Sequence, residues 1–388
     1  YKTRIKATVL FKKIIESQIE TGTPYMLYKD HINHKSNQIN LGTIKSSNLC
    51  AEIVEYSDAN NTAVCNLASI GLPSFIVNGV FDYQRLHEVV GVIVRNIDTI
   101  IDKNFYPSEN ARRTNIQNRP MGIGIQGLAD TFAILKMPFD SPEAKELNRI
   151  IMENIYYSAL DASCSLAKEK GVYETYVGSP TSAGILQQDT WGKVVETLDW
   201  KPLRERIEQY GLRNSLLVAL MPTASTSQIL GYNECFEPFT SKIYMRRTLA
   251  GEFPVVNKYH INDLIKEGLW TPDIQKKVLY YKGSIQKIAE IPERLKECYK
   301  TVWEIKQKVL IDYSADRGCF VDQSQSLNLF FEKPTFEKLY NAHRYGWQSG
   351  LKTGSYYIRI KPAIETQSFT IDPEEAKKIK EEECLVCS

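Results

Sequence analysis

The sequence lacks a charge excess of either sign. Its 48 lysines and arginines nearly balance 46 aspartates and glutamates, which leaves a net charge of +2 over 388 residues. Binding to duplex nucleic acid or to an anionic membrane usually needs a strongly basic face, so we expect neither partner. Long apolar runs are missing as well. The sequence has no stretch of about 18 consecutive apolar residues, the length that a helix needs to span a bilayer.

A signal peptide and an initiator methionine are also lacking. The chain opens on Tyr1, and no secretory leader follows it. We therefore expect a fragment, one half of a split protein or a processed product.

Cysteine, by contrast, is present in number. Eight cysteines are scattered through a chain that is 43% hydrophobic and long enough to bury a large core. Without a secretory signal, this scatter predicts a reducing, cytoplasmic compartment and argues against a disulfide scaffold. A functional pair is then expected to be redox-active or metal-binding. The cysteines are Cys50, Cys65, Cys164, Cys235, Cys298, Cys319, Cys384 and Cys387.

Helical and strand-like patterns alternate along the chain, which predicts an α/β architecture. Apolar spacing predicts helices over 5–20, 83–102 and 291–318. A cap at Ser141, Pro142 at the first helical position and Gly171 past the end predict another helix. Strands are predicted over 52–56, 63–70, 214–220 and 355–361. The apolar stripe of the helix over 83–102 consists of Leu86, Val90, Ile93, Ile97 and Ile101.

The chain is predicted to have two parts. Residues 1–365 form the folded body. Residues 366–388 have few large apolar side chains, and 371–388 carry six acidic and three basic ones. That composition is typical of a mobile tail.

The segment "MGIGIQG" places Gly122, Gly124 and Gly127 at the spacing of a dinucleotide-binding loop. The context is poor, because Arg119 and Pro120 precede it in place of a full hydrophobic strand. No acidic residue ends a clear second strand about 20 positions on. We therefore predict a tight turn with close backbone packing.

Hydroxyl groups crowd the segment "MPTASTSQILG", which directly follows the predicted strand 214–220. Thr223, Ser225, Thr226 and Ser227 lie at a predicted helix start, where free amides and the helix dipole can bind phosphate. An ordinary cap needs only one hydroxyl. A P-loop is excluded because no Gly-Lys-Ser/Thr follows. The local sequence supports a phosphate site and a plain cap about equally.

Alternate positions of "SNLCAEIVEY" carry an amide, a thiol and a carboxylate, at Asn48, Cys50 and Glu52. If this stretch is extended, the three side chains share one face and supply a positioner, a reactive sulfur and a general base. Cys65, on the next predicted strand, lies near enough to join them. The alternative is an edge strand whose polar residues face water, with a buried, inert cysteine.

Tyr356 and Tyr357 are uninformative alone, since aromatic residues are common in strands and the chain has 22 tyrosines.

Cys384 and Cys387 form a C-x-x-C motif one residue before the end of the sequence. Only His31 and His34, far upstream, offer a second ligand pair, which disfavours a zinc site. Prenylation would need a cysteine where Leu385 stands. What remains is a dithiol on a tether that exchanges with other sulfurs.

Taken together and in this order, "SNLCAE", "PTASTSQILG", "KTGSYYIRIKPA" and the terminal "CLVC" resemble the large subunit of class I ribonucleotide reductase. The similarity is to the form typical of eukaryotes and their viruses, and it runs essentially from end to end. It implies the C-terminal part of a ten-stranded α/β barrel, with a radical cysteine on a loop threaded through its centre. Such burial would protect a thiyl radical from solvent.

The resemblance implies a role for each residue of the first cluster. Cys50 is similar to the cysteine that becomes a thiyl radical and takes the 3′ hydrogen of the ribose. Glu52 is similar to the base for the 3′ hydroxyl, and Asn48 to the amide that holds the same region of the substrate. Cys65 is similar to one member of the dithiol that reduces the substrate while the 2′ hydroxyl leaves as water.

The remaining motifs also acquire roles from the resemblance. Tyr356 and Tyr357 are similar to the stacked pair that relays the radical from a di-iron small subunit. Cys384 and Cys387 are similar to the mobile pair that re-reduces the active-site disulfide and is recharged by thioredoxin or glutaredoxin. The loop that cradles the diphosphate of the substrate is matched by Thr223, Ala224, Ser225 and Thr226.

The implied activity is that of a ribonucleoside-diphosphate reductase, which makes deoxyribonucleoside diphosphates for DNA synthesis. The chain itself is expected to bind no metal or cofactor. In the family, about half of the large subunit precedes the segment that matches Tyr1. That N-terminal half holds the allosteric ATP and dNTP sites, part of the barrel and the second cysteine of the dithiol. It is an expected partner, with the small subunit and a second large subunit in a homodimer.

Three other interpretations are open. The adenosylcobalamin-dependent class shares the barrel, the cysteine and often a cysteine tail, but it has no need of a relay such as Tyr356 and Tyr357. A catalytically silent homologue kept as an interaction protein would not need the full set of residues. A generic thiol–disulfide exchanger would leave the phosphate loop unexplained.

Overall fold

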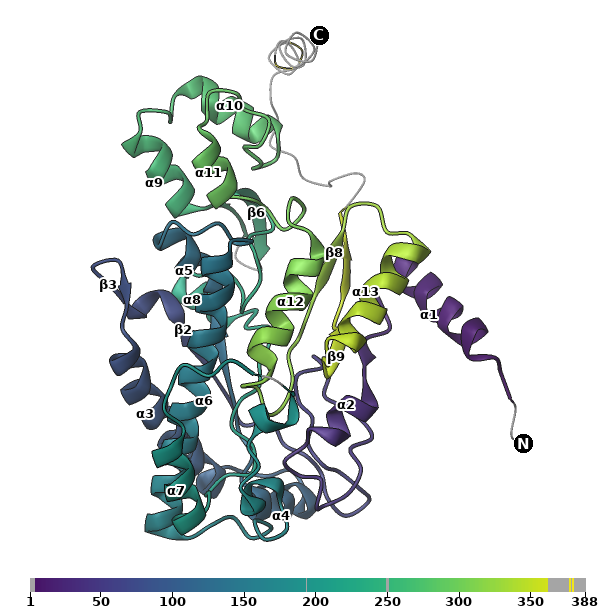
Figure 1. Ribbon diagram of the computed structural model, residues 1–388. Helices are drawn as coiled ribbons and strands as arrows, with labels where there is room; N and C mark the ends of the chain where they lie inside the picture. Colours follow the sequence, from purple (N-terminus) through teal and green to yellow (C-terminus); the bar gives the residue numbers. More distant parts are fainter. Residues whose placement is uncertain (1–3, 193, 249–250, 362–376, 378, 380–388) are drawn as a thin grey trace.

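The computed structural model describes residues 4–192, 194–248, 251–361, 377 and 379 of the chain (Figure 1). The predicted tail over 366–388, with Cys384 and Cys387, lies outside the described residues except for Lys377 and Ile379. Helices and short strands alternate along the described chain, which confirms the predicted α/β architecture.

The α-helices of the described residues are α1 (Ala7–Thr21), α2 (Lys29–His34), α3 (Tyr83–Lys103), α4 (Glu109–Asn118), α5 (Leu128–Ile134), α6 (Pro142–Lys170), α7 (Lys201–Tyr210), α8 (Thr226–Leu230), α9 (Lys258–Lys266), α10 (Pro272–Tyr280), α11 (Glu293–Cys298), α12 (Gln307–Gly318) and α13 (Phe336–Gln348). Short 3-10 helices cover Leu72–Phe75, Pro180–Ala183 and Gln187–Thr190. The strands are β1 (Met26–Leu27), β2 (Leu67–Gly71), β3 (Ile76–Val77), β4 (Val80–Phe81), β5 (Gly122–Gln126), β6 (Ile243–Thr248), β7 (Gly251–Val256), β8 (Leu329–Phe331), β9 (Thr353–Ser355) and β10 (Ile358–Ile360).

The long helices α3 and α6 form where the sequence predicts them, and they pack against each other. The Asp82 carboxylate caps α3 by accepting a hydrogen bond from the Arg85 amide. Helix α6 begins with the Ser141 cap and Pro142 and ends at Gly171. The apolar stripe of α3 that enters the core contains Leu86, Val90, Val94, Ile97 and Ile101.

A row of parallel segments forms the layer on which the candidate site is built. Strand β2 pairs with β5, Ile123 of β5 bridges Val218, and Leu220 bridges Gln325. The segment of Gln325 runs on into β8, which pairs with β10. Hydrogen bonds thus connect, in spatial order, the segments 67–71, 122–126, 217–220, 323–331 and 356–361.

Two of the segments that the sequence predicts to be strands form no regular ladder of backbone hydrogen bonds. Residues 52–56 form no regular strand; instead, side chains bind their amides. Gln323 Oε1 accepts from the Val54 amide at 3.0 Å, and Gln38 Oε1 accepts from the Tyr56 amide at 2.7 Å. Residues 214–220 are buried and extended but make single bridges rather than a ladder. Of the predicted strand 63–70, only the second half lies within β2.

The glycine motif forms a buried strand and not the predicted tight turn. Gly122 and Gly124 lie within β5, and only Gly127 has a positive φ, of 78°. The close packing is confirmed, because a Cβ on Gly122 would lie 2.7 Å from Leu67 Cδ2 and 2.8 Å from Ala219 Cβ. These glycines therefore let neighbouring strands approach, and their spacing needs no nucleotide to explain it.

The predicted helix over 291–318 is interrupted between α11 and α12. The intervening backbone is bound elsewhere: the Val302 amide donates to the Phe239 carbonyl at 2.8 Å, and Lys242 Nζ donates to the Lys300 carbonyl at 3.1 Å. These tertiary bonds replace the intrahelical ladder that apolar spacing alone predicts.

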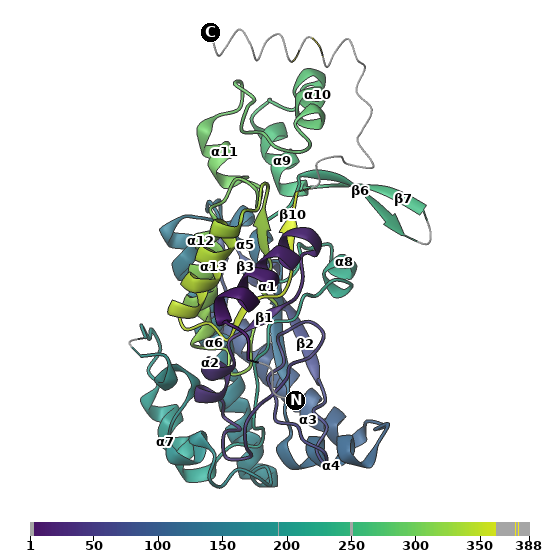
Figure 2. The same ribbon diagram turned by 90° about the vertical axis from the view of Figure 1, so that its right-hand side faces the viewer.

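The hairpin of β6 and β7 projects sideways from the body, and α9, α10 and α11 gather at one end (Figure 2). These three helices surround a satellite core that includes Leu264, Val278 and Leu295. No helix in the part of the chain that the structure describes is both long and apolar enough to cross a bilayer.

Candidate active site

Asn48, Cys50 and Glu52 lie together, but in a tight turn and not along the predicted extended stretch. Ala51 has a φ of 65°, a conformation that costs a residue with a Cβ roughly 1 kcal/mol or more. The Asn48 side chain closes the turn by accepting hydrogen bonds from the amides of Glu52 and Ile53, both at 3.2 Å. The side-chain amide of Asn48 therefore determines the shape of the loop.

Groups on neighbouring segments donate hydrogen bonds to three successive carbonyls of this loop. Ser326 Oγ donates to the Cys50 carbonyl at 2.7 Å, and Thr353 Oγ1 donates to the Ala51 carbonyl at 2.7 Å. The amide of Ser324 donates to the Glu52 carbonyl at 2.8 Å. Ser324, Ser326 and Thr353 are all buried. The backbone around Cys50 is thereby fixed on both of its flanks.

Tyr356 brings a phenol to the sulfur of Cys50. Its hydroxyl donates to Cys50 Sγ at 3.6 Å, across 306 positions of sequence. Tyr357 lies next to it, with the two ring centroids 4.4 Å apart and the rings inclined at 53°. The predicted strand over 355–361 breaks into β9 and β10 at these two tyrosines, which frees the rings to face the Cys50 loop.

Tyr25 is a member of this cluster that sequence analysis missed. Its ring centroid lies 4.7 Å from that of Tyr356 and 5.0 Å from that of Tyr357. The antiparallel pairing of β1 with β9 brings it there, in the register Met26↔Ser355. Nothing in the local sequence signals a pairing between two such distant segments.

Burial raises the pKa values of the acidic groups in this loop above those that they have in water. Desolvation raises the pKa of the Cys50 thiol, with a hydrogen bond from Tyr356 opposing it. Desolvation also raises the pKa of Glu52, although Asn48 and Ser326 partly offset that effect. An S–H group, a phenol and a poised carboxylate together can exchange a hydrogen atom and a proton.

Cys65 lies just before β2 with its side chain open to solvent. Crowding protein atoms, and then the charges of Glu55, Glu52 and Cys50, raise the pKa of its thiol to about 12. The charges of Glu52 and Cys50 thus act on the Cys65 thiol. Glu55 is 4% exposed and accepts from Gln323 Nε2 at 3.2 Å, and burial raises the pKa of Glu55 to about 8.

The hydroxyl-rich segment forms an exposed loop before a short helix. Ala224, Ser225 and Thr226 are exposed. Thr223 is buried, has a φ of 57°, and accepts at Oγ1 from the Cys235 amide at 2.7 Å. Ser225 stands at the cap position of α8 without a side-chain cap hydrogen bond. The interpretation as a plain cap is thus not supported. The Ser225 hydroxyl is available to a ligand.

The predicted helix dipole contributes little to this loop, since α8 has only 5 residues. Side chains of β2 and β5 lie next to the loop instead. Gln126 Nε2 donates to Ser69 Oγ at 3.0 Å, and Ser69 Oγ lies 3.4 Å from Thr226 Oγ1. Loop hydroxyls and amides, rather than a long helix, are what an anion would meet here.

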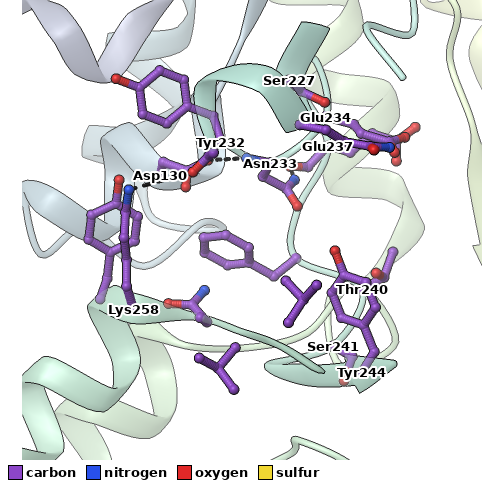
Figure 3. A pocket seen from close by; sticks show the side chains of 17 residues that line it. Asp130, Ser227, Tyr232, Asn233, Glu234, Glu237, Thr240, Ser241, Tyr244 and Lys258 are labelled. Atoms are coloured by element: carbon purple, nitrogen blue, oxygen red, sulfur yellow. Dashed lines mark hydrogen bonds between the residues drawn. The ribbon is translucent and has the colours of Figure 1, made fainter. Parts of the chain in front are cut away.

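A cavity of about 440 Å³ lies between α8 and the β6–β7 hairpin (Figure 3). Ser227, Asp130, Glu237 and Lys258 are among its lining side chains. None of the described residues predicted to be catalytic lines it. Within the described chain, no group of three or more His, Cys, Asp or Glu side chains could hold a metal ion.

Comparisons with known proteins agree on one family. The family model described as "Ribonucleotide reductase, barrel domain" matches residues 1–357. The chain is 55% identical to the ribonucleoside-diphosphate reductase large chain of Schizosaccharomyces pombe, over 95% of this chain and 46% of that protein. It is 56% identical to the ribonucleoside-diphosphate reductase large subunit of Variola virus, over 100% of this chain and 51% of that protein.

Among solved structures, the alpha subunit of the class Id ribonucleotide reductase of Actinobacillus ureae superposes with a TM-score of 0.73 at 27% identity. The match covers 92% of this chain and 61% of that one. The chain spans about half the length of the curated relatives it matches.

Proposed function

The chain belongs to the ribonucleotide reductase family, within its barrel domain, and from that membership we propose that it is the C-terminal half of a ribonucleoside-diphosphate reductase large subunit. The observation that carries this proposal is the hydrogen bond from the Tyr356 hydroxyl to Cys50 Sγ, with the Glu52 carboxyl near enough for its charge to raise the pKa of the thiol. A phenol in contact with a thiol, with a carboxyl nearby, supports hydrogen-atom transfer with acid–base assistance.

In the proposed reaction, Cys50 carries the thiyl radical and takes the 3′ hydrogen of the ribose. Glu52 acts as the base for the 3′ hydroxyl, and Asn48 holds the same part of the substrate. The raised pKa of the Cys50 thiol supports this assignment, because the S–H bond must be intact before the radical arrives. The bonded carbonyls of the loop keep the sulfur in place between turnovers.

The proposed substrate is a ribonucleoside diphosphate whose phosphates lie on the exposed hydroxyl loop. The unused Ser225 hydroxyl and the Thr226 hydroxyl beside Ser69 support that position. Hydrogen bonds from hydroxyls and backbone amides to a charged phosphate are stronger than those to a neutral group. Thr223 and Ala224 complete the cradle through their backbone.

Cys65 is proposed as one thiol of the pair that reduces the substrate and becomes a disulfide. Its open side chain supports this role, since a partner thiol must reach it. Cys384 and Cys387 are proposed to re-reduce that disulfide from the tail over 366–388 and to be recharged by thioredoxin or glutaredoxin. That part of the proposal rests on the sequence resemblance alone.

The proposed partners are the remaining half of the large subunit, a di-iron small subunit that supplies the radical, and a second large subunit. Strand β2 supports the first, because among the described residues it is paired only on its β5 side. The allosteric ATP and dNTP sites are assigned to the other half, and no metal or cofactor is assigned to this chain. We propose a cytoplasmic location, supported by six free thiols among the described cysteines.

The adenosylcobalamin-dependent alternative is disfavoured by one observation. Tyr356 and Tyr357 form a contact pair that ends on Cys50, and a radical generated in place by a cofactor has no use for such a chain of phenols. A silent homologue is disfavoured by the same contact, since an interaction protein has no need to keep a phenol on a thiol.

Reconstitution tests the proposal directly. The chain is combined with the preceding half of the large subunit and a radical-bearing small subunit, and deoxyribonucleoside diphosphate is measured with dithiothreitol as reductant. We expect multiple turnovers with the unaltered chain and none with Tyr356→Phe, which keeps the ring but removes the oxidisable phenol. Equal turnover by Tyr356→Phe would overturn the radical route and favour the cobalamin alternative.

A further inference from the structure

The phenol cluster contains one more tyrosine than the proposed radical route uses. Tyr25 contacts both members of the pair, with ring centroids 4.7 Å from Tyr356 and 5.0 Å from Tyr357. These separations are comparable with the 4.4 Å between Tyr356 and Tyr357 themselves. By distance alone, Tyr25 is as much a part of the cluster as either of them.

Both members of the pair also influence the Tyr25 hydroxyl. The pKa of Tyr25 is raised by desolvation and by a side-chain hydrogen bond with Tyr357, and is lowered by one with Tyr356. Tyr356 in turn reaches Cys50 Sγ at 3.6 Å. The side chains therefore form a series of contacts that runs Tyr357, Tyr25, Tyr356, Cys50.

Radical transfer along these four side chains balances in atoms and electrons without any additional base. A phenoxyl radical on Tyr357 takes a proton and an electron from the Tyr25 hydroxyl; the Tyr357 O–H bond forms and the Tyr25 O–H bond breaks. The Tyr25 radical then takes a hydrogen atom from Tyr356, which takes one from the Cys50 S–H. One oxidising equivalent, supplied by the small subunit under the proposed function, moves from the first oxygen to the sulfur.

We propose that Tyr25 is a third redox-active tyrosine, which carries the radical between Tyr357 and Tyr356 through its hydroxyl. This inference rests on the proposed function and adds a catalytic residue to it. Direct contact of the two rings in the pair is the competing route. The two routes differ in one respect only, namely whether the Tyr25 oxygen is needed.

The test places 3-aminotyrosine, which traps a radical because it is easily oxidised, at position 356 of the full large subunit. Radical formation is followed by rapid mixing and electron paramagnetic resonance, with and without Tyr25→Phe. Phenylalanine keeps the ring packing and removes only the hydroxyl. We expect radical formation at position 356 to slow at least about tenfold in the Tyr25→Phe background. An unchanged rate would overturn the proposal.

Two further measurements separate a redox role from a structural one. With 3-aminotyrosine at position 25 itself, a radical should form there; its absence would overturn the proposal. Tyr28→Phe is the matched control, because the Tyr28 hydroxyl also lies against the C-terminal segments, donating to the His343 carbonyl at 2.6 Å. We expect Tyr28→Phe to leave the rate unchanged, and an equal slowing would reveal a general disturbance of the β1–β9 pairing.

The same experiment distinguishes failure of this inference from failure of the proposed function. If 3-aminotyrosine at position 356 traps no radical in an otherwise unaltered subunit, the phenol route itself is absent and both proposals fall. If it traps a radical at the same rate with and without the Tyr25 hydroxyl, only the role of Tyr25 falls.

Discussion

The loop that carries Cys50 and the loop that carries Thr226 differ in how far this chain determines their geometry. Around Cys50, three successive carbonyls accept hydrogen bonds from buried residues. Around Thr226, three successive residues are exposed and the cap hydroxyl is unused. The proposed radical side is therefore built in advance, whereas the proposed diphosphate side is completed by what binds it.

The difference follows from what each side must do. A hydrogen atom moves only over a short distance, so errors in the position of the sulfur are costly, and a clamped loop reduces them. A diphosphate brings its own charge and several acceptor oxygens, so flexible hydroxyls can adjust to it. Four variants test this contrast, in order of decreasing expected effect.

Cys50→Ser should cause the largest loss. A hydroxyl of similar size fits the clamped loop but does not carry a radical as a thiol does. Turnover should fall to less than about one part in a thousand, while the dissociation constant for a ribonucleoside diphosphate stays near normal. Product per enzyme and equilibrium binding are the two measurements. Multiple turnovers by Cys50→Ser would remove the radical assignment.

Glu55→Gln should change how the free energy of unfolding depends on pH, because Glu55 is a buried carboxyl that follows the Cys50 loop. Burial raises the pKa of Glu55 from 4.5 to about 8, so between these values the unfolded chain has lost a proton that the folded chain keeps. The contribution is thus present below pH 4.5 and is lost as pH rises towards about 8. Glu55→Gln should remove this loss, on the order of 5 kcal/mol over the whole range. Urea unfolding from pH 4.5 to 8.5 measures it; parallel curves for both proteins would contradict the prediction.

Ser225→Ala with Thr226→Ala should affect binding and little else. Loss of two hydroxyl contacts to a charged group should raise the substrate KM roughly 30-fold, at about 1 kcal/mol for each, with a smaller change in kcat. The matched control is Ser227→Ala, because the buried Ser227 hydroxyl has no hydrogen-bond partner among the described residues. A fall in kcat without a change in KM would place the loop in the chemistry instead.

Ser326→Ala should have the smallest effect of the four. It leaves the Cys50 carbonyl without its 2.7 Å donor, so the loop should loosen at a cost of about 1 kcal/mol. The expected result is a several-fold lower kcat with an unchanged KM. Ser355→Ala is the control, since the buried Ser355 hydroxyl has no partner within the described chain. Equal effects of the two substitutions would show that the clamp is not what holds Cys50.

The parts of the structure that sequence analysis predicted correctly are those determined by local signals. Helices α3 and α6 carry their own caps and apolar periodicity, so they form as expected. The break between α11 and α12 was missed because partners from distant segments, such as Phe239, bind its backbone. Periodicity does not register such bonds.

The candidate site shows the same division. Asn48, Cys50 and Glu52 were correctly grouped, but by a wrong geometry, since Asn48 closes a turn that no alternation rule predicts. Tyr25 could not be found at all, because its place depends on the pairing of β1 with β9. The roles assigned to these residues stay proposals until the substitutions above are measured.

The pairing of β1 with β9 has a consequence for how the protein is made. Synthesis runs from the N-terminus, and early segments begin to fold before late ones exist. Contacts between such distant segments form late, since the intervening chain must first be ordered. Tyr25 and Cys50 therefore emerge long before Tyr356, which reaches Cys50 across 306 positions. A nascent chain that stalls before β9 carries Cys50 without Tyr356 and Tyr357, so the proposed radical route can be completed only after β9 has been synthesised.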